Sequence, residues 1–259
     1  QGSGNAITVG TSGWTIAGGT FAGGDSAVSI NGTLAISGGV YTATSATTSI
    51  GLTTGPCAVN TPLNMTAGTF NHGNGRMTVY GGRVVGQACN TTAQLVFPVG
   101  FTVYDFEAAS TPSAGGWHSF LSATSATTIN VARNYYHYGQ VINFTADVKG
   151  DVYINTNETP ETGVIRLSGT TDQYYNYTSG MAPTIRVDKV SGAALPGGGV
   201  TNFSAWSLEV LQGSFTAPSG ALNLGMTTWS AVSHNALLVS SGTTFSTNGG
   251  TIRFNLARD

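Results

Sequence analysis

The sequence predicts an all-β protein built as a right-handed parallel β-helix. Three observations lead to this prediction. Short alternations of apolar and hydroxyl-bearing residues follow one another along almost the whole chain, no segment has the 3.6-residue period of an amphipathic helix, and a glycine-centred motif recurs. The chain has 37 glycines among 259 residues, roughly double the usual share of about 7%.

Each expected strand ends at a turn signal, because glycine, asparagine or serine follows the apolar alternation. Successive side chains of a strand point to opposite faces, so every second residue can enter a core. In chain order, the expected strands lie within segments 6–10, 14–19, 27–32, 33–39, 63–70, 76–86, 94–108, 163–169, 184–189, 206–215, 236–242 and 251–256.

The recurring motif sets the expected length of one coil. It occurs as Gly-Gly-Thr-Phe at Gly18, Gly-Gly-Val-Tyr at Gly38, Ala-Gly-Thr-Phe at Ala67 and Gly-Gly-Arg-Val at Gly82, with later echoes at Gly213 and Gly250. The first four starts are unevenly spaced, and their mean separation of roughly 20 residues fits one coil of a parallel β-helix. Glycine suits the corners because it adopts positive φ without steric cost.

The regular pattern breaks in three places, at about 108–126, at 155–163 and at 191–204, and the first of these contains a lone Trp117-His118 pair. We therefore expect an N-terminal solenoid region (1–108), a loop or boundary (109–126) and a C-terminal solenoid region (127–259). Two β-sandwich domains divided near residue 108 are the alternative fold.

Low charge excludes several classes of function. Charged residues make up 8% of the chain, against about 25% in an ordinary domain, and the nine basic residues are scattered. Phosphate neutralisation needs clustered basic residues, so we expect no nucleic-acid partner. No apolar run has the length of about 20 residues that a membrane helix needs, so no transmembrane segment is expected. Zinc, calcium and dinucleotide motifs are absent from the sequence, so neither a metal nor a cofactor is expected.

Two kinds of covalent modification are candidates. Cys57 and Cys89 are the only cysteines, and they form a disulfide if the protein is exported, or two buried free thiols otherwise. Seven Asn-X-Ser/Thr sequons are candidate glycosylation sites, although many arise by chance in a chain rich in Asn and Thr. These sequons are Asn31, Asn64, Asn90, Asn143, Asn157, Asn176 and Asn202.

Two similar groups of tyrosines are the strongest local feature. The segments Asn134–Gln140 and Gln173–Gly180 each carry three tyrosines, and the second group follows the first by close to two coils. Tyrosine combines an apolar ring with a hydroxyl, which suits a sugar-binding or protein interface; the alternative is that alternate tyrosines fill the core. The candidates are Tyr135, Tyr136, Tyr138, Tyr174, Tyr175 and Tyr177.

Acidic residues and lysines give weaker signals. Asp105 and Glu107 lie on the same face of one expected strand, and paired carboxylates are the minimum for glycoside hydrolysis. Asp147, Asp151, Glu158 and Glu161 form the densest acidic group, which we interpret as a solvated loop. Lys149 or Lys189 has the chemistry for an isopeptide bond with an asparagine. No catalytic motif is found, and the four histidines are far apart, so we expect no enzyme activity.

Several phrases resemble the repeats of large bacterial extracellular β-solenoid surface proteins, the adhesins and autotransporter passengers. They are GGTF, INGTLAISGG, GVIRLSGTTDQ, TIRVDKVSG and FTAPSGALNLG. The resemblance implies a secreted or surface-displayed structural or adhesive role and brings no catalytic residue.

We therefore expect a structural protein located outside the cell or on its surface. It would be a surface rod, fibre subunit or adhesin stalk with an inert, hydroxyl-rich surface, and it would self-associate end to end or laterally through its strand edges. Surface glycans are further expected partners. The alternative is a carbohydrate-binding or carbohydrate-active β-helix protein, a lyase or hydrolase.

Overall fold

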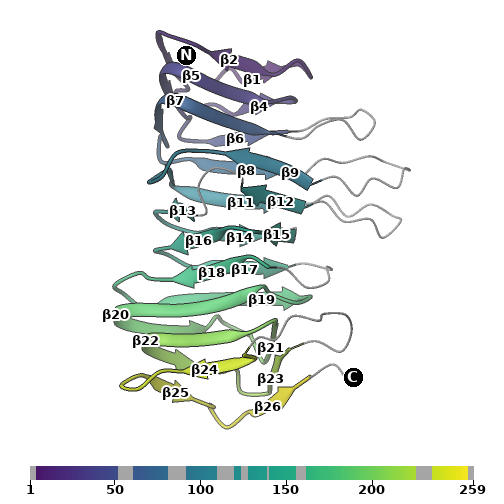
Figure 1. Cartoon of the computed structure of the whole chain (residues 1–259), viewed down its shortest axis with the longest axis vertical. Helices are drawn as coiled ribbons and strands as arrows, with labels where there is room; N and C mark the ends of the chain where they lie inside the picture. The colour runs from purple at the N-terminus through teal and green to yellow at the C-terminus, as the bar shows by residue number, and fades with distance from the viewer. Residues whose placement is uncertain are drawn as a thin grey trace, which may run out of the picture.

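The structure, a computed structural model, describes residues 4–51, 61–80, 92–109, 120–123, 128–138, 140–155, 162–225 and 235–255. These residues contain strands and no helix. Every pairing between these strands is parallel. The strands stack along one long axis, with the first and last coils at opposite ends (Figure 1). The predicted all-β class with parallel strands is thus confirmed.

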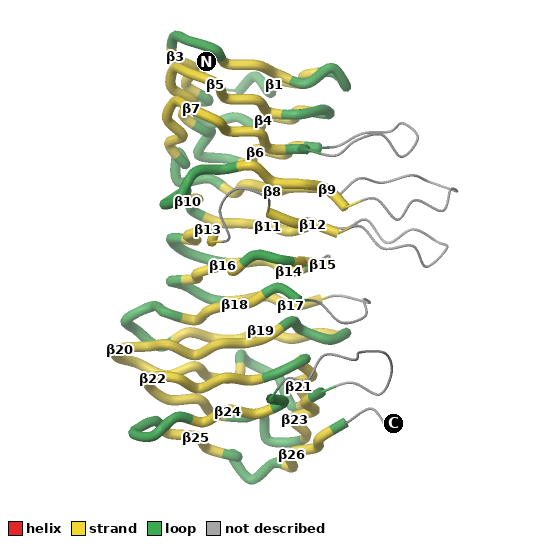
Figure 2. The backbone as a smooth tube through the Cα atoms, in the orientation of Figure 1, coloured by secondary structure: helices red, strands yellow, loops and turns green. Residues whose placement is uncertain are grey.

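Successive strands occupy three faces in turn, and each coil pairs with the next coil along the axis (Figure 2). Face 1 is the row of paired strands that begins with β1. In axial order it consists of β1 (Ile7–Val9), β4 (Val28–Ile30), β6 (Thr47–Ile50), β8 (Arg76–Tyr80), β11 (Asp105–Ala109), β14 (Tyr135–His137), β17 (Val152–Asn155), β19 (Gln173–Ser179), the second halves of β20 (Thr184–Pro196) and β22 (Leu208–Thr216), and β25 (Thr244–Ser246).

Face 2 follows face 1 in each coil. It begins with β2 (Trp14–Ile16), the first halves of β5 (Leu34–Thr42) and β7 (Leu63–Asn71), β9 (Thr92–Val96), β12 (Phe120–Ala123) and β15 (Gln140–Ile142). Towards the C-terminus it consists of β21 (Asn202–Ala205), β23 (Ala221–Leu224) and β26 (Thr251–Phe254).

Face 3 completes each coil. It consists of β3 (Thr20–Ala22), the second halves of β5 and β7, β10 (Thr102–Val103), β13 (Thr128–Val131), β16 (Thr145–Val148), β18 (Val164–Leu167), the first halves of β20 and β22, and β24 (Leu237–Val239). Because β20 and β22 run through a corner, they belong to both face 3 and face 1 and join these faces in one sheet.

Coil length varies along the stack. Ile7 pairs with Val28, and Val28 pairs with Thr48, so the first two coils are almost equal in length. The next coil is longer, because Thr48 pairs with Met77, whereas the coil that starts at Tyr135 is shorter, because its partner is the first residue of β17. These lengths agree with the irregular coils of ~20 residues that the sequence predicts.

The recurring motif forms one corner and the strand that follows it. Phe21, Tyr41 and Phe70 are in register on face 3, and the ring centroids of neighbouring members are 5.1 and 5.7 Å apart. The echo at Gly213 places Phe215 over Phe245 in the same way on face 1, at 5.8 Å. The motif at Gly82 lies outside the described residues. The described copies of the motif therefore stack aromatic side chains from coil to coil.

Glycine is required at this corner for two reasons. Gly19, Gly39 and Gly68 follow one another from coil to coil with φ of 73°, 68° and 84°, a region that other residues rarely adopt. A Cβ atom at Gly39 would also overlap the carbonyl oxygen of Gly19 in the preceding coil. The corner backbones approach each other this closely only because no side chain separates them.

The core is a continuous column of apolar side chains inside the three faces. Aromatic stacks run through it at several levels, among them Phe106 on Tyr135, with ring centroids 5.8 Å apart, and Tyr175 on Phe215, at 5.3 Å. Stacked pairs of this kind stabilise by about 0.5–1.5 kcal/mol beyond their burial. The side chains facing outward are mostly short and polar, as the alternating burial along the strands requires.

The alternative of two β-sandwiches is not what the structure contains, because sandwiches are antiparallel and the described pairings are all parallel. The division at 109–126 stays a prediction, and much of that segment lies outside the described residues. Within it, Phe120–Ala123 form β12, which pairs with β9 and β15.

Candidate functional site

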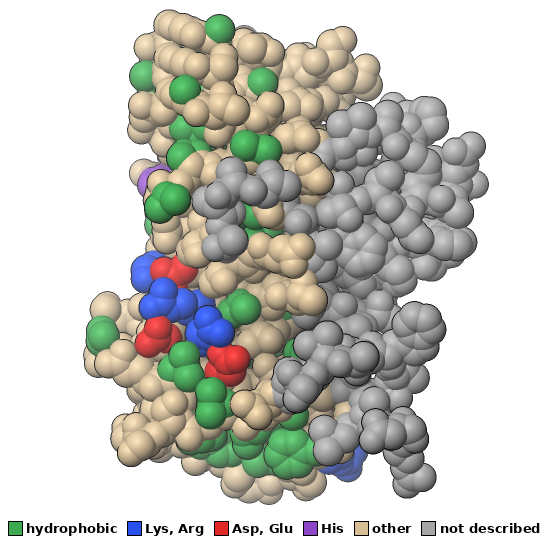
Figure 3. Space-filling model, in the orientation of Figure 1, with side chains coloured by type: hydrophobic (Ala, Val, Ile, Leu, Met, Phe, Trp, Pro, Cys, Tyr) green, Lys and Arg blue, Asp and Glu red, His purple; other side chains and the backbone are tan. Residues whose placement is uncertain are grey.

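Charge is concentrated in the middle of the chain. The sequence up to Gly75 contains one charged residue, Asp25, and the segment 210–252 contains none. On the face shown in Figure 3, most acidic and basic side chains gather in one group over β16, β18, β20 and β22, a further basic patch lies at the C-terminal end, and the coils above show no acidic or basic side chain. The molecule therefore has a charged middle section and two ends with few charges, which among the described residues are Asp25 and Arg253.

An outward cluster of tyrosines lies on face 1 of this middle section. Tyr136 is in register with Tyr153, and their rings stack at 4.8 Å with an angle of 10° between planes. Arg76 places its guanidinium carbon 3.8 Å from the centroid of the Tyr136 ring, and Tyr138 lies 6.2 Å from the same ring. We call Arg76, Glu107, Tyr136, Tyr138 and Tyr153 the tyrosine patch.

The tyrosine patch is electrically balanced. Arg76 donates a hydrogen bond of 3.0 Å to Glu107, which also accepts one of 3.3 Å from the Thr78 hydroxyl. Partial burial and then the charge of Glu107 raise the pKa of Tyr138 above its ordinary value, although Arg76 acts in the opposite direction. Its phenol is therefore neutral at physiological pH and can both donate and accept hydrogen bonds.

The structure divides the six predicted tyrosines between the core and the surface. Tyr135 and Tyr175 are buried in the core, as the alternative interpretation requires. Tyr136, Tyr138 and Tyr177 are half-buried, and Tyr174 is 42% exposed. Tyr136 and Tyr138 thus lie together in the tyrosine patch.

Tyr174 and Tyr177 lie apart from the tyrosine patch. The Tyr177 hydroxyl donates to the carbonyl of Gly180 at 2.5 Å. Tyr153, which the sequence analysis did not single out, completes the patch instead. Only the register between coils, which pairs Tyr153 with Tyr136, could have identified Tyr153 as part of the patch.

The carboxylates of Asp105 and Glu107 are each neutralised by a different arginine. Asp105 is 2% exposed, and it accepts two hydrogen bonds from the Arg133 guanidinium and one from the backbone NH of Asn134. The hydrogen bond to Asp105 raises the pKa of Arg133. Carboxylates held in this way are poor candidates for the acid and nucleophile of glycoside hydrolysis.

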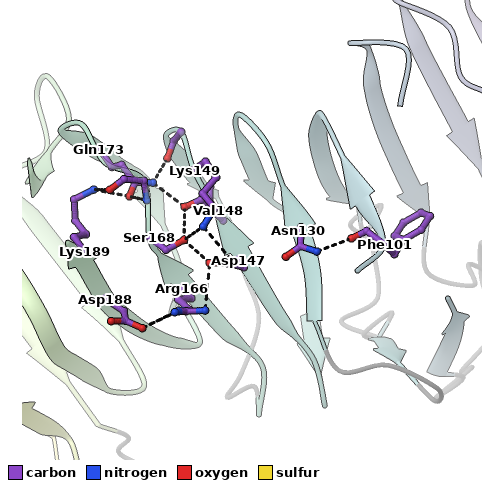
Figure 4. Close-up of polar contacts among 12 residues, drawn as sticks. Phe101, Asn130, Asp147, Val148, Lys149, Arg166, Ser168, Gln173, Asp188 and Lys189 are labelled. Carbon is purple, nitrogen blue, oxygen red and sulfur yellow. Dashed lines mark hydrogen bonds and ion pairs between the residues drawn. The ribbon is translucent and has the colours of Figure 1, made fainter. Parts of the chain in front are cut away.

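An ionic ladder crosses face 3. Asn130, Asp147, Arg166, Arg186 and Glu209 are in register on successive coils. Arg166 binds Asp188 at 2.6 Å and lies 3.8 Å from Asp147, and Arg186 binds Glu209 at 2.6 Å. Figure 4 shows part of this ladder, in which each charge lies beside an opposite one on a neighbouring strand. These pairs fix the axial register of the coils.

Of the predicted acidic group, Asp147 and Asp151 are described. Asp147 accepts hydrogen bonds from Ser168 and, at 3.2 Å, from Lys149, while Asp151 accepts one of 2.8 Å from the backbone NH of Tyr174. Both therefore bind neighbouring coils, and Asp147 is buried on a strand, which corrects its interpretation as part of a solvated loop. Glu158 and Glu161 lie outside the described residues.

Lys189 is fully buried at the corner between faces 3 and 1. Its ammonium group donates hydrogen bonds to the carbonyl oxygens of Gly169 and Thr171 and to the side-chain oxygen of Gln173, at 2.7, 2.8 and 2.7 Å (Figure 4). Burial lowers the pKa of Lys189. The hydrogen-bonding partner that the structure gives this lysine is a glutamine and not the asparagine of the isopeptide hypothesis.

The two ends of the stack present strand edges. Among the described residues, β1 and β2 each pair with one strand, as do β25 and β26 at the other end. Leu238, Val239 and Phe254, three of the exposed large apolar side chains, lie in the C-terminal strands, and Phe254 is 51% exposed. Protein edges are usually protected by charge or proline, and β1, β2, β24 and β25 have neither.

The modification candidates occupy varied positions. Asn143 and Asn202 are exposed, whereas Asn31, Asn64 and Asn176 are half-buried. The Asn176 side chain donates to the carbonyl of Val152 at 3.3 Å. Cys57, Cys89, Asn90 and Asn157 lie outside the described residues, so the predicted disulfide and these two sequons stay predictions.

Metal-binding clusters and membrane helices are not found in the described part of the chain. Within these ranges, no group of three or more His, Cys, Asp or Glu side chains could hold a metal ion. No helix in the same residues is long and apolar enough to cross a membrane. Comparisons of the chain with family models, with curated proteins and with solved structures give no match. The fold alone therefore defines the class of protein: an all-β protein of stacked parallel coils.

Proposed function

We propose that this protein is a structural, extracellular rod that assembles end to end into a surface fibre or stalk. The observation that carries the proposal is the pair of ends: strand edges whose single charged residue is Arg253, backed by apolar side chains, close both extremities of the described stack. An open edge offers unpaired backbone NH and CO groups to another strand. A second copy presents edges of the same parallel kind.

The lateral surface supports the same proposal. Its outward side chains are chiefly Thr, Ser and Asn, and most of its charges are already paired within the rod. A surface of this kind attracts neither polyanions nor polycations. Contacts along the axis are then favoured over contacts at the sides. The predicted disulfide and sequons belong to this extracellular role.

Light scattering and negative-stain electron microscopy across a concentration series test the proposal. We expect rods whose length grows with concentration and whose assembly persists when salt is raised from low to physiological values, since no ion pair crosses the joint. Monomers at every concentration, or assemblies that dissolve at physiological salt, would contradict the proposal.

The tyrosine patch favours a second function, binding of a neutral glycan. Its phenols and its paired Arg76 and Glu107 offer hydrogen bonds without net charge, next to partly exposed aromatic rings. A glycan array with the wild type and a Tyr153→Ala variant tests this function. Binding that the substitution abolishes supports it, and an array without a bound glycan contradicts it.

A further inference from the structure

The strand edges define how two copies join. We propose that the C-terminal coil of one copy docks on the N-terminal coil of a second copy through faces 1 and 2, with β25 beside β1 and β26 beside β2. This inference rests on the proposed end-to-end assembly and specifies its register. The partner is a second copy of this chain because each end supplies the parallel edge that the other lacks among the described residues.

The inward side chains have matching spacings at the two ends. On face 1, Phe245 points inward because it is in register with buried Phe215, and Ile7 does so because it pairs with buried Val28. On face 2, Ile252 is in register with buried Leu222. The separation along the chain from Phe245 to Ile252 equals that from Ile7 to Trp14.

This spacing allows both faces to pair at once. Trp14 and Ile16 are in register with the buried pair Leu34 and Ile36, so they point inward as well. Seating Phe245 over Ile7 therefore seats Ile252 over Trp14 and Phe254 over Ile16 of the second copy. A shift by two residues would place Phe254 over Gly18, where no side chain covers it.

The degree of exposure fits this joint. Phe254 is 51% exposed although it continues the row of buried Leu224. Phe245, Ile252 and Trp14 are half-buried, whereas their counterparts in inner coils are fully buried. These side chains lack an adjacent coil that would cover them. Docking would place them in the environment that inner coils give to Phe215 and Leu222.

The outward side chains supply a test of the register. With Ile252 over Trp14, Arg253 lies opposite Thr15 of the second copy, and both are exposed. Arg253 is the charged residue of the last described strand. In the shifted register, Ala17 takes the place of Thr15. The sign of a charge introduced at residue 15 therefore reports whether Arg253 is its neighbour.

Face 3 ends one strand earlier, at β24, so the joint is formed by two faces. The contact is heterologous, because the C-terminal end of one copy meets the N-terminal end of another. Such contacts do not close into a dimer. Each added copy presents a fresh C-terminal coil, and a linear filament results.

The association constant of four variants, measured by light scattering at low salt, tests the register. We expect Thr15→Glu to strengthen association and Thr15→Lys to weaken it, each about two- to five-fold, as for charged cross-strand pairs. High salt should remove the difference. The matched controls are Val99→Glu and Val99→Lys, at a 92% exposed position in the middle of the rod; they should leave the constant unchanged.

The outcomes separate this inference from the proposed function. If all variants assemble and residue 15 shows no dependence on the sign of charge, this register is wrong and end-to-end assembly stands. If the association constant depends instead on the sign of the charge introduced by Ala17→Glu and Ala17→Lys, the shifted register is established. If neither the wild type nor any variant associates, both the inference and the proposed function fail.

Discussion

Burial of the Tyr41 hydroxyl predicts a loss of stability in alkali. Tyr41 is fully buried, and its hydroxyl and that of Thr48 have no hydrogen-bond partner among the described residues. Burial raises the pKa of Tyr41 from 10.0 to about 12, and the nearby Thr48 hydroxyl acts in the opposite direction. The folded state therefore favours the neutral phenol. The stability that the neutral Tyr41 phenol contributes is fully present below pH 10 and is lost as pH rises through 12.

The magnitude follows from linkage. A difference of about two pKa units corresponds to a total of about 2.7 kcal/mol, of which about 1.4 kcal/mol is lost by pH 11. Urea denaturation of the wild type and of Tyr41→Phe at pH 8 and pH 11 measures it. The variant should lose about 1.4 kcal/mol less than the wild type between these pH values. At pH 8 the variant should be at least as stable, because the substitution removes an unpaired hydroxyl.

Other buried groups act equally in both proteins. Tyr175, whose pKa burial also raises, destabilises the fold in alkali, and Lys189, whose pKa burial lowers, acts in the opposite direction. Both effects cancel when the variant is compared with the wild type. An equal loss of stability in the two proteins would refute the reasoning about Tyr41.

Three further predictions concern the corners and the paired charges. Gly39→Ala should destabilise by at least about 1–3 kcal/mol, because positive φ and the Gly19 carbonyl both oppose a side chain, whereas Gly18→Ala, with open space around it, should be nearly neutral in thermal unfolding. Asp105→Asn should cost about 1.5–3 kcal/mol and Glu107→Gln under about 1 kcal/mol in urea denaturation; equal costs would contradict the contrast in burial. Lys189→Met should cost about 1–3 kcal/mol, because two carbonyls lose their donor, and an unchanged midpoint would show that solvent replaces the ammonium group.

The fold was predictable from the sequence because its signals are local. Glycine at Gly19 and Gly39 followed by Phe21 and Tyr41 reports both the corner and the stacked ring, and the distance along the chain between the two motifs reports the coil. The position of Gly250 was misleading, because it precedes β26 on face 2 and lies outside the stacked aromatic corner.

The tyrosine patch was only partly predictable because it depends on register between coils of unequal length. The similar segments suggest that Tyr135 aligns with Tyr174. In the structure Tyr135 aligns, through Val152, with Tyr175, which is one residue further on. Side chains alternate between the two faces of a strand, so an offset of one residue exchanges core and surface. Composition and motif spacing do not fix the register between coils to within one residue.

The location of the ion pairs in the middle coils bears on how such a rod changes length during evolution. Coils joined by Arg166–Asp188 or Arg186–Glu209 each have one correct neighbour, since deletion of a coil would leave a charge unmatched. The described residues of the terminal coils form no such ion pair. A duplicated coil inserted there would meet mainly apolar and hydroxyl-bearing neighbours, so the ends are where repeats can be gained or lost at little cost in stability.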